Sequence, residues 1–342
     1  MGMAQVVLVT GVSRDLSARF ARALAAEGDI DVIGVDVAPP RHELGAVNFV
    51  RADIRNPAIS KVILGSQVDT VVHMATLATP GSAGGRSTMK EINVVGTMQL
   101  LASCQRAESV RKLVLQSSAA VYGASPRDPV KYTEETPPQA PPQTGFGKDS
   151  VEIETYLRGL ARRRPDVVVT TLRLAHLMGA GVDSEIARYL SLPVVPKVLG
   201  FDARLQFLHP VDAVEALLTV TRSDVPGTFN VGADDVVPLS QALRMMGRPP
   251  IGVPKRLAPA LAGVARHAGL LEFPPDQIDA LTYGRGMDCS RIAEVTGFRP
   301  RYSSRQALEE FVALAQPGLL AEQRVDRALD SLASLLAPQA RR

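Results

Sequence analysis

The residues best suited to chemistry begin near the N-terminus, in the stretch TGVSRDLS at 10–17. A glycine-containing turn between a strand and a helix is a typical phosphate site, because free N–H groups and the helix dipole face the anion. Gly11 takes the first place of a G-x-x-G-x-x-G fingerprint, whereas Arg14 and Ser17 take the other two. Arg14 is bulky but could contact phosphate through its guanidinium, and Asp15 adds a negative charge. Taken alone, the turn is equally compatible with an ordinary strand-helix connection.

Two acidic residues further along favour a dinucleotide site. Asp36 ends the second predicted strand, about 25 residues after Gly11, where a carboxylate accepts hydrogen bonds from a ribose diol. The same charge repels a 2′-phosphate, so the sequence predicts NAD rather than NADP as the cofactor. Asp53 and Ile54 end the third strand, where the edge of an adenine could be held, although a strand-end Asp is often only a turn residue.

These residues stand at the ends of alternating strands and helices. Short β-branched apolar runs predict buried strands, and apolar residues at helical spacing predict the helices between them. The alternation predicts an α/β fold, a Rossmann-like doubly wound parallel sheet with a smaller C-terminal substrate lobe. The predicted strands are 5–11, 31–36, 48–54, 69–75, 111–119, 166–175 and 228–232, and the main helices are 16–28, 90–106 and 148–163.

The regular alternation of strands and helices ends after Leu177, and the domain boundaries are predicted from that change. The C-terminal segment after Pro317 is predicted to be helical, because its apolar side chains stand at helical spacing: Val325, Leu329, Leu332 and Leu336. The predicted units are an NAD-binding Rossmann domain at 1–175 with a returning segment at about 204–232, a substrate lobe at 176–203 and 233–300, a closing helix at 301–316, and a C-terminal helical extension at 317–342.

The composition argues against several classes of protein. The chain has 342 residues, 46% hydrophobic and 21% charged, which suits one large α/β domain with an appended lobe. A net charge of +3 does not indicate a nucleic-acid partner, and no apolar run approaches the roughly 20 residues of a membrane span. Cys104 and Cys289 have no metal-ligand spacing, and the N-terminus lacks a signal-peptide pattern. We therefore expect a cytoplasmic protein without a metal site.

Seven motifs, in order along the chain, resemble those of the extended short-chain dehydrogenase/reductase family, the NAD-dependent epimerases and dehydratases of nucleotide sugars. The resemblance covers roughly residues 5–316, and it implies a Rossmann-like fold, an NAD cofactor and a nucleotide-sugar ligand. A closer similarity is to an actinobacterial subgroup often labelled UDP-glucose 4-epimerase, which shares the Phe and Ser of F-x-K-D-S and the Arg of the phosphate turn. The motifs are TG at 10–11, VVHMAT at 71–76, NVVGT at 93–97, SSAAVYG at 117–123, LRLAHLMG at 172–179, RLQFLHPVDA at 204–213 and MDCSRIAEVTGFRP at 287–300.

The resemblance also implies roles for individual residues. Ser118 matches the catalytic Ser or Thr that hydrogen-bonds the substrate oxygen being oxidised, although a serine that only satisfies the backbone is the alternative. The implied substrate-binding residues are His176, which replaces a common Asn, together with Arg204 and Asp212. The implied cofactor-binding residues are Gly11, Ser13, Arg14, Asp36, Asp53, Ile54, His73, Ala75 and Asn93, of which His73 is expected to be mainly structural.

The stretch QTGFGKDSVEIE at 143–154 matches the family pattern Y-x-x-x-K followed by an acidic residue, except at its two chemical positions. Phe146 takes the tyrosine place and Ser150 the lysine place, while Glu154 keeps the acidic place and fixes the register. In the family the tyrosine, its pKa lowered by the ammonium, acts as the general base. Phe146 has no ionisable group, and the loss of a general base typically costs about 10²–10⁴-fold in rate.

Three hypotheses for function remain open. The favoured one is an impaired or non-catalytic family member that binds NAD(H) and a nucleotide sugar as a sensor or scaffold. The second is an active epimerase, dehydratase or reductase with a relocated acid/base, although Lys148 points away on a helix and nothing favours Asp149. The third is a cofactor-free interaction protein, consistent with Arg14, Asp15 and Ser17 in the phosphate turn. A homodimer through the helices at about 90–106 and 148–163 is expected, because the family commonly pairs them.

Overall fold

A computed structural model of the chain describes residues 5–260, 263, 275–315 and 318. Within them lies a seven-stranded sheet with the order β11-β6-β5-β4-β1-β2-β3, in which every neighbouring pair is parallel. This confirms the predicted doubly wound parallel sheet. The order reverses between β1 and β4, and such a switch point leaves a ligand-binding crevice outside the carboxyl ends of the strands. The strands are β1 (Gln5–Thr10), β2 (Ile30–Asp36), β3 (Asn48–Arg51), β4 (Thr70–His73), β5 (Lys112–Ser118), β6 (Val168–Leu174) and β11 (Gly227–Val231).

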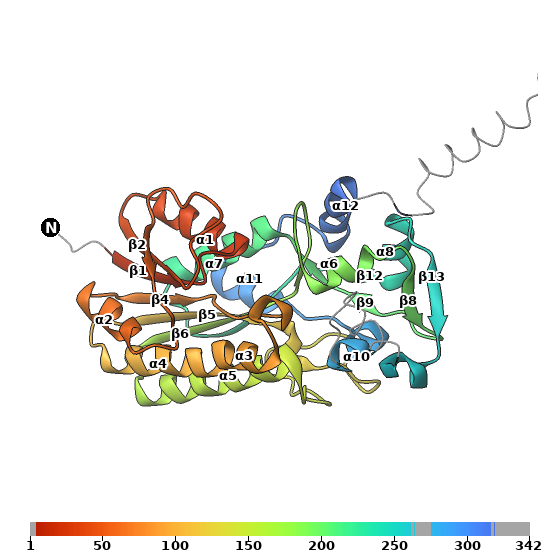
Figure 1. Ribbon diagram of the computed structural model, residues 1–342, viewed down its shortest axis with the longest axis horizontal. Coiled ribbons are helices and arrows are strands. Elements are labelled where there is room, and N and C mark those ends of the chain that lie inside the picture. The colour runs from red at the N-terminus through yellow and green to blue at the C-terminus, as the bar shows by residue number, and fades with distance from the viewer. Residues whose placement is uncertain (1–4, 261–262, 264–274, 316–317, 319–342) are drawn as a thin grey trace, which may run out of the picture.

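Helices cover both faces of this sheet and form a separate apolar core on each (Figure 1). Because both faces of a parallel strand are covered, β1 is a continuous apolar run, and Val7, Leu8 and Val9 are fully buried. One face carries α1 (Asp15–Ala25), α7 (Pro210–Arg222) and α11 (Ser290–Thr296). The other carries α2 (Ala58–Gly65), α4 (Gly96–Arg106) and α5 (Gly145–Arg163).

The helix predicted at 90–106 is interrupted by a wider turn. It consists of α3 (Arg86–Lys90), a π-helical turn η2 (Glu91–Val95) and α4. The extra residue of a π-turn shifts side chains out of α-helical register, and such turns occur frequently at functional sites. Asn93, in the middle of η2, is fully buried at this point.

The helix α5 begins at Gly145, earlier than the predicted start at about Lys148, so that Phe146 and Ser150 lie in its first two turns. Its start packs against the short 3-10 helix η3 (Ala119–Tyr122), where a Cβ on Gly147 would lie 2.9 Å from the carbonyl oxygen of Ala120. Neither α5, with its 19 residues, nor another helix in the described part of the chain is long and apolar enough to cross a membrane.

The chain leaves the carboxyl end of β6 for a smaller lobe with its own core, which the closing helix α12 joins through Leu308 (Figure 1). The position of α11 differs from the predicted domain units. Residues 233–300 were predicted to belong to the substrate lobe, whereas Ile292 and Phe298 pack in the core beside the large sheet. The predicted extension at 317–342 lies outside the described residues, apart from Gly318. The elements of the lobe are β7 (His176–Leu177), α6 (Glu185–Leu190), β8 (Val195–Val198), β9 (Arg204–Leu205), β10 (Phe207–Leu208), β12 (Val237–Pro238), α8 (Leu239–Met245), β13 (Pro250–Val253), α10 (Pro275–Tyr283), β14 (Gly284–Arg285) and α12 (Ser304–Leu314).

Candidate functional site

The crevice at the switch point begins at Gly11, the residue that follows β1. Gly11 has a φ of +82°, in the left-handed region that favours glycine. A Cβ at this position would lie 2.9 Å from the Cα of Ala75, just beyond β4, so glycine alone lets the turn approach that strand end. Gly11 therefore supplies the tight turn that the first glycine of a dinucleotide fingerprint supplies.

Arg14, in the second position of the fingerprint, reaches across this crevice. It is the extended residue before α1, and its guanidinium donates hydrogen bonds to the backbone carbonyls of Ala75, at 3.3 Å, and of Thr76. Burial lowers the pKa of the guanidinium, and the negative charge of Asp36 opposes that shift. The side chain thus links the turn after β1 to the segment after β4.

The other departures from the fingerprint do not enter the crevice. Asp15 is exposed, and its carboxylate pairs with Arg19 at 2.9 Å on the surface of α1. Ser17 is buried in the first turn of α1. The negative charge that the sequence places near a phosphate is therefore neutralised by Arg19 at the surface.

Asp36 ends β2 beside the turn. Its carboxylate oxygens accept the N–H group of Ser13 at 3.0 Å and that of Val37 at 2.7 Å. Each oxygen has a second acceptor position, so the carboxylate can still accept hydrogen bonds from a diol. The Ser13 hydroxyl donates to the carbonyl of Ala38. The fold thus brings Gly11, Ser13 and Asp36 together at one edge of the sheet.

Asp53 and Ile54, the residues expected near an adenine, both have protein partners. The Asp53 carboxylate pairs with Arg55 at 2.6 Å, and this hydrogen bond holds the pKa of Asp53 below its usual value. The side chain of Ile54 packs on the start of α4, where a Cβ on Gly96 would lie 2.9 Å from it. The pairing of Arg55 with this carboxylate was not predicted from the sequence.

His73 ends β4 and is buried between two threonines. Its Nδ1 lies 2.8 Å from Thr10 Oγ1, and its Nε2 lies 2.8 Å from Thr97 Oγ1. Thr97 donates its own hydrogen to the carbonyl of Asn93, so Nε2 donates to Thr97 and Nδ1 accepts from Thr10. Burial and the charge of Arg14 lower the pKa of His73 to about 4. The neutral imidazole therefore connects β1, β4 and α4, which agrees with the structural role expected for it.

Ser118 and the start of α5 lie on neighbouring elements, because η3 follows Ser118 and packs on α5. Ser118 Oγ accepts the N–H group of Ala120 at 3.1 Å and caps η3. Phe146 is half-buried, and the buried Ser150 donates its hydroxyl to the backbone carbonyl of Phe146 at 2.9 Å. The three positions where the family pattern has catalytic side chains are Ser118, Phe146 and Ser150, and none of them carries an ionisable group.

The ionisable group next to Ser150 is already paired. Asp149 is fully buried and accepts hydrogen bonds from both terminal nitrogens of Arg86, at 2.6 and 2.7 Å. Asn93 Nδ2 donates to the same carboxylate at 3.1 Å, and its amide also bonds the backbone of Leu77 at 2.7 and 2.9 Å. The role of Arg86 was not predicted from the sequence, although an acidic residue amid the apolar positions of α5 indicates that a cation lies opposite it.

Glu154, which fixes the register of α5, lies in a second buried network. It accepts a hydrogen bond from Ser117 at 2.7 Å and pairs with Arg173 at 2.7 Å. Arg173 donates to the Tyr122 hydroxyl at 2.8 Å, which in turn donates to Asn230 at 2.7 Å. Burial raises the pKa of Tyr122, so its phenol stays protonated. This network joins α5 to β5, β6 and β11 and offers no base to a ligand.

Two of the three predicted substrate residues lie at the junction with the lobe. His176 is half-buried, and burial with the charge of Arg285 lowers its pKa to about 4, so the imidazole is neutral at pH 7 in the ligand-free protein. Arg204 is half-buried, and among the described residues its guanidinium has no hydrogen-bond or ion-pair partner. Arg204 therefore keeps its charge available for an anionic group.

The third predicted substrate residue, Asp212, is only 1% exposed and bonds the protein backbone. It is buried in the first turn of α7, and its two oxygens accept the N–H groups of Arg301 and Tyr302 at 3.0 Å each. These bonds hold the segment before α12. Asp212 therefore makes a structural contact, and its contact with a ligand stays a prediction.

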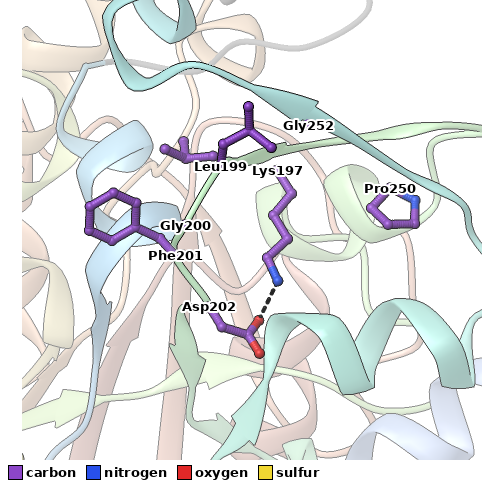
Figure 2. A pocket seen from close by; sticks show the side chains of 8 residues that line it. Lys197, Leu199, Gly200, Phe201, Asp202, Pro250 and Gly252 are labelled. Carbon is purple, nitrogen blue, oxygen red and sulfur yellow. Dashed lines mark hydrogen bonds and ion pairs between the residues drawn. The ribbon is translucent and has the colours of Figure 1, made fainter.

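A hollow of about 430 Å³ lies in the lobe beside the paired strands β8 and β13, next to the turn at 199–202 (Figure 2). Figure 2 shows Lys197 reaching Asp202, and these two side chains are 2.9 Å apart. No residue of the predicted site lines this hollow, so the candidate site remains the crevice. Its lining residues are Lys197, Val198, Leu199, Gly200, Phe201, Asp202, Pro250 and Gly252.

A model of the NAD-dependent epimerase/dehydratase family matches residues 7–232. The match includes the turn at Gly11, the end of β2 and the start of α5. The chain belongs to the NAD-dependent epimerase/dehydratase family. This confirms the family that the seven motifs predicted.

Relatives of the chain include proteins with and without a described activity. An uncharacterized protein of Mycobacterium tuberculosis is 45% identical over 312 residues, which are 90% of this chain and 83% of that protein. UDP-glucose 4-epimerase of Lactobacillus helveticus is 29% identical over 185 residues, which are 53% of this chain and 54% of that protein.

Solved structures of nucleotide-sugar enzymes share the fold. UDP-glucose 4-epimerase from Stenotrophomonas maltophila, with bound NAD and formylated UDP-arabinopyranose, matches with a TM-score of 0.71 and 21% identity over 95% of this chain and 99% of that one. A tyrosine-to-phenylalanine mutant of UDP-glucuronic acid 4-epimerase from Bacillus cereus, in complex with UDP-4-deoxy-4-fluoro-glucuronic acid and NAD, matches with a TM-score of 0.69 and 17% identity over 90% and 98%.

Proposed function

We propose that the protein binds NAD and a nucleotide-sugar-like ligand but is an impaired or non-catalytic member of its family. The observation that carries this proposal is the hydrogen bond from Ser150 to the backbone of Phe146, 2.9 Å long, at the two positions where the family pattern has lysine and tyrosine. Neither side chain can take a proton from a ligand hydroxyl or donate one at neutral pH.

The geometry of the crevice supports NAD binding. Gly11 provides the tight turn at the N-terminus of α1, and Asp36 provides an acceptor for a ribose diol at the end of β2. The related epimerase structures with bound NAD have the same fold. NAD would supply a hydride acceptor, whereas Ser118 would hold the hydroxyl of the ligand and Arg204 would face its phosphates.

A relocated base has little support among the groups around the start of α5. Asp149 is paired with Arg86, which would have to leave before the carboxylate could accept a proton. The pKa of His73 lies at about 4 because of burial, and burial raises the pKa of Tyr122. Each of the three groups therefore has a structural partner, and the pKa shifts of His73 and Tyr122 move both groups away from neutral pH.

We further propose that the protein is a homodimer. The outer surface of α4, α5 and the preceding turn η2 carries three large apolar side chains that are 36–44% exposed, Val95, Met98 and Tyr156. A second copy that covers these helices would remove this apolar surface from water.

The proposal is tested by denaturing the purified protein and identifying the released nucleotide by mass spectrometry, followed by calorimetric titration with NAD. Release or binding of NAD without turnover of nucleotide sugars supports it. A protein that carries no NAD and binds none in titration is instead a cofactor-free interaction protein.

A further inference from the structure

The side chain of Arg14 crosses the crevice at the switch point, where a dinucleotide would place its pyrophosphate. Its backbone belongs to the turn after β1, and its guanidinium ends at the carbonyls of Ala75 and Thr76, after β4. Ligands of open α/β sheets bind outside the carboxyl ends of the two strands that flank such a point. One side chain therefore spans the two walls of the predicted phosphate site.

The charge of this guanidinium has only neutral partners. A guanidinium carries five N–H donors, and here two of its nitrogens donate to backbone carbonyls. Among the described residues no carboxylate forms an ion pair with Arg14, and Asp36 acts on it only at longer range. Arg14 is half-buried, and partly removing a cation from water without an anionic partner is costly. An incoming anion relieves that cost.

We propose that Arg14 is a pyrophosphate-binding residue that replaces the second glycine of the fingerprint. When a dinucleotide binds, the guanidinium leaves the carbonyls of Ala75 and Thr76 and pairs with the pyrophosphate. The planar fork of donors matches phosphate oxygens bidentately, and the phosphate also lies at the N-terminus of α1. This inference rests on the proposed binding of NAD.

The alternative role for the same side chain is an obstacle that fills the phosphate site and prevents cofactor binding. The two roles make opposite predictions for Arg14→Gly, which restores the glycine of the fingerprint. If Arg14 is a ligand, the variant loses a charge-assisted contact and binds more weakly. If Arg14 is an obstacle, the variant opens the site and binds more tightly.

The experiment is calorimetric titration of wild type, Arg14→Gly and Arg14→Lys with NAD, ADP and adenosine at two salt concentrations. We expect Arg14→Gly to weaken NAD and ADP binding about tenfold or more, since a hydrogen bond to a charged group is worth that much. Arg14→Lys should lose less, because it keeps the charge. Adenosine, which has no phosphate, should bind all three proteins equally, and the salt dependence of NAD binding should be smaller in Arg14→Gly.

The control is Arg22→Gly, because Arg22 is an exposed residue in the last turn of α1, the helix that Arg14 precedes. It should leave the affinity for NAD unchanged, and circular dichroism should show that every variant is folded. Equal or tighter NAD binding by Arg14→Gly overturns the role of Arg14 while leaving the proposed function standing. If wild type and Arg14→Gly both fail to bind NAD, the proposed function is wrong and this inference is wrong with it.

Discussion

The hydroxyl of Ser150 donates a hydrogen bond to the backbone carbonyl of Phe146, 2.9 Å away and one turn earlier in α5. The bond satisfies the polar atom of Ser150, a residue only 3% exposed. A lysine at this position would need an acceptor for its ammonium in the crevice, whereas serine needs none. The two substitutions thus form a locally stable helix start that has lost its ionisable groups.

The carboxylate of Asp36, held beside the turn after β1, predicts a preference for NAD over NADP. Asp36→Ala should weaken NAD binding roughly tenfold or more, because the hydrogen bond from a ribose hydroxyl to a charged acceptor is lost. It should weaken NADP binding less, because the same change removes the repulsion of the 2′-phosphate. Calorimetry with both dinucleotides measures this, with Asp31→Ala, an exposed acidic residue of the same strand, as the control. Tighter binding of NADP than of NAD by wild type would show that Asp36 does not select the cofactor.

The buried pair of Asp149 and Arg86 predicts an asymmetric loss of stability. Arg86→Met should lower the free energy of unfolding by about 3 kcal/mol, because it leaves the Asp149 carboxylate buried without a cation. Asp149→Asn should cost less, because the Arg86 side chain is 37% exposed and can turn to water. Urea unfolding of the two variants measures the difference.

The control for this pair is Arg19→Met, which breaks an exposed ion pair with Asp15 and should cost at most about 1 kcal/mol. If Arg86→Met is no more destabilised than this control, the pair does not hold α5 against α3.

The buried imidazole of His73 predicts how stability depends on pH. Its pKa is about 4 in the folded protein and about 6.5 in the unfolded chain, so the unfolded state binds the proton first. The corresponding stability is complete above pH 6.5 and is lost as the pH falls towards 4, by about 3 kcal/mol in total. Unfolding free energies between pH 7 and pH 5 should therefore fall more steeply for wild type than for His73→Gln. Identical pH dependence of the two proteins would mean that folding does not lower the pKa of His73.

Much of the fold was predictable because local patterns encode it. The parallel strands were predicted from short apolar runs. Gly11 and Asp36 were predicted as site residues because they stand at the carboxyl ends of strands, which a parallel sheet brings to one edge. The start of α5 was placed too late, because Gly145 and Gly147 lower helix propensity although Gly147 is required by its contact with Ala120.

The partners of the charged residues were not predictable, because they come from distant parts of the chain. Asp149 and Arg86 are 63 positions apart, and Asp212 bonds the backbone of Arg301, 89 positions away. A sequence shows that a buried carboxylate needs a partner but does not show which residue supplies it. The π-helical turn at Asn93 likewise follows from packing and has no sequence pattern of its own.

The exposed apolar residues on α4 and α5 predict the oligomeric state. Wild type should have the mass of a dimer at micromolar concentration, and Met98→Glu should be monomeric, because a dimer would bury the introduced charge. Light scattering measures both masses. The control is Val295→Glu, an equally exposed apolar position on α11 at the opposite face of the sheet, which should remain dimeric. A monomeric wild type would rule out this interface.

If proton transfer was lost through Phe146 and Ser150 alone, restoring the tyrosine and the lysine should restore activity. In Phe146→Tyr combined with Ser150→Lys, the ammonium lowers the pKa of the new phenol and allows it to act as a base. The tyrosine alone should gain little, because the pKa of its phenol would stay near its usual value of about 10. A double variant that folds and binds NAD but stays inert would locate a further loss in the ligand pocket around His176.

The most direct test follows NADH absorbance and exchange between epimers when NAD-loaded protein is mixed with a panel of nucleotide sugars. We predict no change for wild type and a measurable change for the variant with Phe146→Tyr and Ser150→Lys. Turnover by wild type at an ordinary enzyme rate, near roughly 10 s⁻¹, would contradict the central claim that the two substitutions removed the catalytic proton transfer.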